Sequence, residues 1–71
     1  MKITPNEQAF NLACYVIIND RVMLDGYSRK HQAKEISRVI RLVFGSFTFT
    51  SFELNAIANR AMRVCYDDEA A

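Results

Sequence analysis

The chain has 71 residues, of which 51% are hydrophobic, and it carries a formal net charge of +1. This length suits one small apolar core near the lower size limit for a stable domain, and it excludes a division of these residues into several domains. The nearly neutral charge excludes a polycation, so binding to nucleic acid would require a local cluster of basic residues.

A first helix is predicted to begin at Pro5. Thr4 is a suitable N-cap, because its hydroxyl can accept a hydrogen bond from a free backbone N–H at the helix start. Proline is favoured at the first helical position, and Glu7 completes a capping box with Thr4. The three residues together indicate where this helix starts.

Two structures compete for residues 15–24. In one, a single helix runs over residues 5–24, with apolar side chains all round it that neighbouring helices and a partner chain cover. In the other, the helix ends near Ala13, and the β-rich residues on either side of Asn19 and Asp20 form a hairpin. We favour the helix, because an isolated two-stranded hairpin is only marginally stable in water.

A second helix is predicted over residues 28–44, with Ser28 as its N-cap and Gly45 just past its end. Helical spacing separates its side chains into two faces. The apolar face contains Ala33, Ile36, Val39, Ile40, Val43 and Phe44. The basic face contains Lys30, Lys34, Arg38 and Arg41. This helix therefore offers one face to a core and the other to water or to an anion.

A third helix is predicted over residues 51–66. Thr50 and Glu53 have the spacing of a capping box, and Phe49 and Leu54 that of the hydrophobic staple across it. The apolar face of this helix contains Leu54, Ile57, Ala58, Ala61, Met62 and Cys65.

These elements predict an all-α fold. Residues 1–71 would form a single compact domain of three helices near residues 5–24, 28–44 and 51–66, with a short acidic C-terminal tail at residues 67–71. A short β-hairpin at residues 15–24 is the alternative for that segment.

Few side chains are suited to catalysis. His31 is the only histidine, and Cys14 and Cys65 are the only cysteines, which is too few for an ordinary zinc site. A nucleophilic Cys-His pair would need the fold to bring one of these cysteines to His31. No phosphate-binding glycine loop or nucleophile-elbow motif is present. We therefore expect a protein that is not an enzyme, without a metal, a cofactor or a small-molecule substrate.

The sequence also predicts a cytoplasmic protein. The N-terminal residues include polar Asn6 and Glu7 before any apolar stretch, so no secretory signal is indicated. The longest apolar run, residues 9–18, has about half the length of a membrane span, so we expect no membrane association.

The basic face is the strongest functional signal. Lys30, Lys34, Arg38 and Arg41 extend over about 16 Å of one helix edge. We expect them to contact a macromolecular partner with an acidic surface, a protein in preference to a nucleic acid. Further residues predicted for this contact are Arg60, Arg63 and Phe52. The chain would act as a regulator or inhibitor by occupying that surface.

Three other interpretations stay open. A run of charges is often no more than a solvated face. The last two helices resemble a helix-turn-helix in outline, in which Asn55, Asn59, Arg60 and Arg63 would meet the nucleic acid, although the connection is longer than usual for that motif. A structural assembly subunit is the third interpretation.

Two sets of apolar residues complete the predictions. Phe47 is expected to close the core beneath the connection between the last two helices, whereas Phe52 lacks an intramolecular role and would mark an interaction surface. Tyr15, Ile18 and Val22 lie on one side of the first helical wheel. We expect these three residues to form a homodimer interface, since a second copy buries surface that one small chain leaves exposed.

Overall fold

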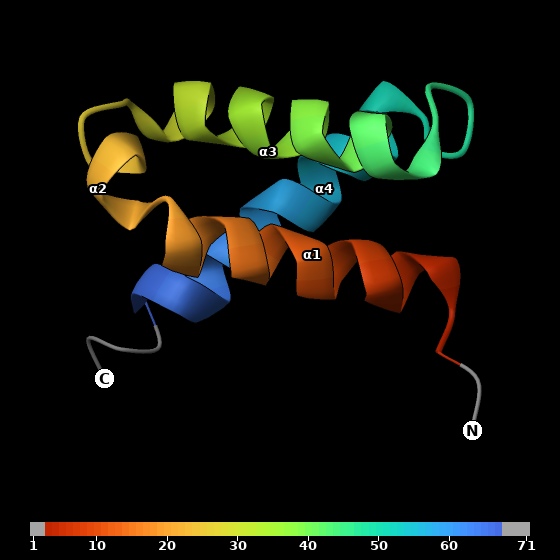
Figure 1. Cartoon of the computed structure of the whole chain (residues 1–71), viewed down its shortest axis with the longest axis horizontal. Coiled ribbons are helices and arrows are strands. Elements are labelled where there is room, and N and C mark those ends of the chain that lie inside the picture. The colour runs from red at the N-terminus through yellow and green to blue at the C-terminus, as the bar shows by residue number, and fades with distance from the viewer. Residues whose placement is uncertain (1–2, 68–71) are drawn as a thin grey trace.

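The computed structural model describes residues 3–67, and within them the chain is helical and contains no strand (Figure 1). The helices are α1 (Pro5–Asn19), α2 (Arg21–Leu24), α3 (Arg29–Phe44) and α4 (Ser51–Met62), followed by a π-helical turn, η1 (Arg63–Asp67). The predicted all-α fold is confirmed, and residues 15–24 do not form the alternative hairpin. Within the predicted acidic tail, Asp67 ends η1, and residues 68–71 lie outside the described residues.

Helices α1 and α3 run in opposite directions, one above the other, and α4 crosses behind them (Figure 1). Helix α4 packs against both, so one core is shared by all three helices. The large side chains that are fully buried in this core are Ile17, Leu24, Ile36, Ile40 and Leu54.

The first predicted helix is interrupted at Asp20. This residue has φ −107° and ψ 24°, outside the helical range, although its N–H still donates to the Val16 carbonyl at 2.9 Å. Asn19 and Asp20 favour such a break because short polar side chains compete for backbone hydrogen bonds. The Asn19 side-chain amide donates to the Tyr15 carbonyl at 2.9 Å. After the break, α2 places Leu24 in the core.

The predicted helix starts and the predicted glycine end are confirmed. The hydroxyls of Thr4 and Ser28 accept hydrogen bonds from the backbone N–H three residues on, each at 3.2 Å. Thr50 and Glu53 form both bonds of the predicted capping box, whereas the box predicted for Thr4 and Glu7 has only the bond to the Thr4 hydroxyl. Gly45 has φ +97°, in the region that favours glycine. Local chemistry therefore sets where these helices begin and where α3 ends.

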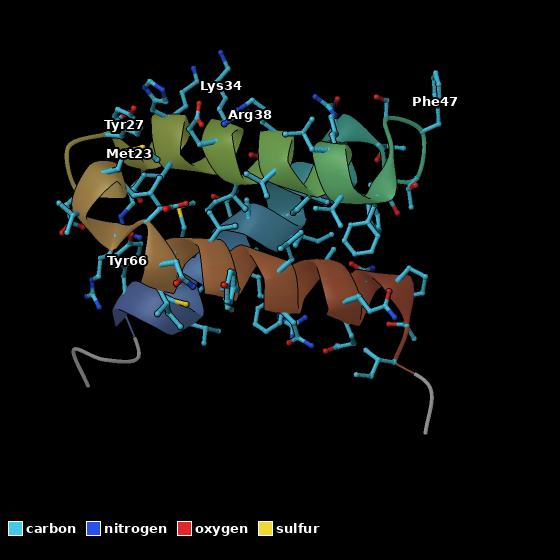
Figure 2. The ribbon with its side chains drawn as sticks, viewed as in Figure 1. Met23, Tyr27, Lys34, Arg38, Phe47 and Tyr66 are labelled. Atoms are coloured by element: carbon cyan, nitrogen blue, oxygen red, sulfur yellow. The ribbon has the colours of Figure 1, made fainter. Side chains whose placement is uncertain are left out.

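Two residues that the sequence predicted for the core, Val43 and Phe47, are exposed. Val43 is 62% exposed, and Phe47 is fully exposed and projects from the connection after α3 (Figure 2). The space predicted for Phe47 is filled by Phe49, which is buried and meets Phe44 edge to face at 5.7 Å. Since one phenylalanine closes this end of the core, the core prediction for Phe47 was wrong.

The chain after α4 is held by a cation–π clamp. Helix α4 ends at Met62, and the remaining residues of the predicted third helix form η1. The Tyr66 ring lies 4.3 Å from the Arg29 guanidinium and 5.5 Å from that of Arg21. Because these arginines belong to α3 and α2, the clamp joins three segments that are distant in the sequence.

Gln32 fixes the turn between α2 and α3. Its side chain is buried, and its amide nitrogen donates to the Leu24 carbonyl at 2.7 Å and to the Tyr27 carbonyl at 3.2 Å. These bonds satisfy two backbone carbonyls at the turn, whereas the Oε1 atom of Gln32 is buried without a hydrogen-bond partner among the described residues. On the helical wheel Gln32 falls between Val39 and Val43, inside the apolar arc of α3, which agrees with its burial.

We predict that Gln32→Ala destabilises the fold by about 1 to 2 kcal/mol, because one buried and one partly buried hydrogen bond are lost. Urea denaturation followed by circular dichroism measures the change. Gln8→Ala is the matched control, since Gln8 is exposed on α1 and should give a change close to zero. Equal stability of the two variants would contradict the role of Gln32.

Candidate functional site

A groove with a volume of about 460 Å³ lies between α3 and α4. One side is formed by α3 and the other by the first turns of α4. The residues that line it are Lys30, Lys34, Ser37, Arg41, Ser51, Phe52 and Asn55. It is the place where sequence-predicted binding residues from two helices come together.

The α3 side of the groove follows from helical geometry. Lys30, Lys34, Ser37 and Arg41 are spaced i, i+4, i+7 and i+11, which places them in one line along the helix. Lys30 and Arg41 are about 16 Å apart along the axis at 1.5 Å per residue. Because the apolar side of α3 packs into the core, this line faces outward.

The positive charge of the groove is not neutralised by the part of the chain that the structure describes. No carboxylate is among its lining residues, and no ion pair involves Lys30 or Lys34 within residues 3–67. The Arg41 guanidinium donates to the Ser51 hydroxyl at 3.0 Å, a neutral partner that connects α3 to α4. Uncompensated cations at a concave surface attract anionic groups.

Phe52 provides the apolar part of the groove. Its side chain is 84% exposed although it belongs to the first turn of α4. The sequence predicted that Phe52 has no role in the core, and its exposure agrees with that prediction. An exposed aromatic ring beside free cations is typical of interaction surfaces.

Arg38 lies beside the groove and not in it. Its guanidinium forms an ion pair with Glu35 at 3.1 Å, within α3. Figure 2 shows Lys34 and Arg38 on the side of α3 that points away from α1. The predicted stripe of four cations therefore contains three that line the groove and one whose charge is balanced locally.

Arg60 and Arg63 are separated from the groove and from each other. The Arg60 guanidinium lies 4.2 Å from the Phe10 ring and 3.9 Å from Glu7, so it faces α1. Arg63 lines a second hollow of about 260 Å³, together with Arg29, Asn59 and Met62. The residues proposed to meet nucleic acid in a helix-turn-helix thus do not share one surface.

The residues predicted for a dimer interface are all exposed. Tyr15 and Ile18 lie one turn apart near the end of α1, whereas Val22 lies in α2, beyond the break at Asp20. Their exposure leaves them accessible to a second chain.

The sequence did not predict Ser37 and Ser51 as binding residues, and it named Asn55 only for the helix-turn-helix alternative. Ser37 has a sequence signal, since it occupies the i+7 position of the basic line. Ser51 has none, because its place beside α3, like that of Asn55, depends on how α4 packs. The groove itself is a product of tertiary structure.

The cysteines and the histidine do not form a nucleophilic pair. Cys14 lies beside Cys65. The pKa of the Cys14 thiol is raised from 9.0 to about 11, first by burial and second by contact with the Cys65 side chain. The His31 ring is instead stacked on Tyr27, with ring centroids 4.1 Å apart. A thiol with a raised pKa is a poor nucleophile near neutral pH, because little thiolate is present.

Residues 3–67 contain no group of three His, Cys, Asp or Glu side chains placed to hold a metal ion. Nor does any helix in this part of the chain combine the length and apolar character needed to cross a membrane. Comparison of the chain with protein-family models, curated proteins and solved structures gives no match.

We predict that the rate of alkylation of folded Cys14 by iodoacetamide reaches half of its maximum near pH 11, and near pH 9 once the chain is unfolded in urea. The folded state favours the neutral thiol, so this stabilisation is present below pH 9 and is lost as the pH rises to about 11. Mass spectrometry of the peptide containing Cys14 measures the modified fraction. Alkylation of the folded protein with a midpoint near pH 9 would contradict the assigned burial.

Proposed function

We propose that this chain is a small binding protein without catalytic activity, which regulates or inhibits a larger protein by occupying an acidic surface of it. The observation that carries the proposal is the groove between α3 and α4. There Lys30, Lys34 and Arg41 line one concave surface together with exposed Phe52, and no carboxylate of the described residues lines it. We place this activity in the cytoplasm, where Cys14 and Cys65 would remain free thiols.

The groove supplies the two components that protein recognition needs. Uncompensated cations accelerate encounter with an acidic surface and fix its orientation. Burial of an aromatic side chain contributes much of the affinity in many interfaces. Phenylalanine and arginine are residue types enriched in protein interfaces, and Phe52 and Arg41 both line the groove.

A protein partner is favoured over duplex DNA. A helix that reads a duplex presents several polar side chains along one surface. Along α4, Asn55 lines the groove, Arg60 faces α1, and Asn59 lines the second hollow. Three groove cations would also give only a short phosphate track.

Affinity capture with three baits tests the proposal. The baits are the wild type, the double variant Lys34→Glu with Arg41→Glu, and the control Arg38→Glu, applied to a nuclease-treated lysate of cells that express the protein. We expect a protein that is captured by the wild type and the control and lost with the double variant. The expected loss in affinity is at least about tenfold for the reversal of two contacting charges.

Arg38→Glu is a sharp control because it reverses a charge of α3 outside the groove. Capture that the double variant leaves unchanged would contradict a role for the groove and favour an assembly subunit. Capture that occurs in an untreated lysate and is abolished by the nuclease treatment would assign the groove to nucleic acid.

We also propose that the protein forms a homodimer through Tyr15, Ile18 and Val22. All three side chains are more than half exposed, and they surround the junction of α1 with α2. Contact with a second copy would remove this apolar surface from water, a gain that a chain with a small core needs.

We expect Ile18→Asp to shift the dimer to a monomer, because a buried carboxylate without a partner is strongly unfavourable. Sedimentation velocity over a concentration series measures the shift. Leu42→Asp is the matched control, since Leu42 is similarly exposed at the other end of the molecule on α3. A wild-type monomer at every concentration, or dissociation caused only by Leu42→Asp, would exclude this interface.

A further inference from the structure

Resting on the proposed function, we propose that the groove binds an acidic segment of the partner in extended conformation, with an apolar side chain of that segment against Phe52. Three features of the groove favour this ligand: the spacing of its cations, the polar residues on both of its sides, and its single aromatic ring.

The cation spacing fits a short extended peptide. Lys30 and Lys34 are separated by about 6 Å along the α3 axis, and Arg41 lies about 10 Å further on. Acidic residues at alternate positions of an extended chain are about 7 Å apart and share one side of it. About five or six extended residues would therefore cover the distance from Lys30 to Arg41.

The polar residues of the groove distinguish an extended segment from a helix. Ser37, Ser51 and Asn55 offer hydroxyl and amide groups that can both donate and accept hydrogen bonds. An extended peptide has free backbone N–H and C=O groups that need such partners, whereas a helix satisfies these groups internally. A helix laid in the groove would cover Asn55 without pairing its amide, which is unfavourable.

Short side chains also give the ligand room. Ser37 and Ser51 have the shortest side chains of the groove, and the Arg41 guanidinium reaches Ser51 from α3. A peptide backbone can approach α3 and α4 closely there, while its carboxylates reach the cations and its apolar side chain reaches Phe52.

A single-stranded nucleic acid fits this groove less well. Surfaces that bind single strands carry several aromatic rings on which successive bases stack. Of the residues that line the groove, only Phe52 is aromatic. One ring suits a ligand with one apolar anchor, which is the arrangement expected of an acidic peptide.

Fluorescence anisotropy with four synthetic probes tests the proposal. The first is a labelled peptide of alternating glutamate and serine with one central phenylalanine, flanked by proline to prevent helix formation. The second has the same acidic residues and phenylalanine on an alanine-rich helical framework. The third replaces glutamate by glutamine in the first, and the fourth is an oligothymidylate. We expect the extended acidic peptide to bind most tightly and the glutamine peptide to bind at least about tenfold more weakly.

Three pairs of matched variants locate the binding. Lys34→Glu and Phe52→Ala should each weaken the extended peptide by about tenfold, whereas Arg38→Glu and Phe47→Ala should leave it unchanged. Asn55→Ala should weaken it about threefold to fivefold, and Asn59→Ala should have no effect. All six positions are exposed, so the variants should keep the fold, which circular dichroism checks.

Each other outcome overturns the proposal in a recognisable way. Tighter binding of the helical peptide would assign the groove to an acidic helix, and tighter binding of oligothymidylate would assign it to nucleic acid. If no acidic peptide binds but lysate capture still depends on Lys34 and Arg41, the protein-binding function stands and the extended segment is wrong. If both assays are insensitive to these residues, the groove has neither role.

Discussion

The structure depends on the close packing of α4 against α1 through alanines. Ala9 and Ala13 of α1 and Ala58 and Ala61 of α4 have no exposed surface. Small side chains at these positions let two helix backbones approach closely, so that Leu54 and Ile57 can reach the remaining core. The packing density of a core leaves little tolerance at such contacts. The position of α4, and with it the groove beside α3, follows from this constraint.

The groove shows how a very small core leaves other surfaces for binding. Helix α3 uses Ile36 and Ile40 to contact the core, and this orientation turns the line from Lys30 to Arg41 outward. Helix α4 begins next to that line because the Thr50 cap ends a short connection. Neither helix forms the groove alone. A binding surface made by two helices is therefore sensitive to changes in the core that never touch a ligand.

Local sequence signals predicted the helix starts well and the tertiary features poorly. Ser28, Thr50 and Gly45 were identified because a cap acts within four residues. The break at Asp20 was missed, because Asp20 makes no side-chain capping bond that would mark the start of α2. Sequence spacing assigned Phe49 to the staple with Leu54, and Phe49 is buried, but spacing did not exclude Phe47 from the core. The basic line was predicted, but the division between Arg38 and the groove cations depends on where α4 lies.

The order in which the chain leaves the ribosome gives the α1–α4 contact a consequence for synthesis. Helix α1 is made before α4, the helix with which it packs most extensively, and α4 follows about forty residues later. At typical translation rates this interval lasts several seconds. The core shared by the three helices can therefore be completed only after α4 has been synthesised.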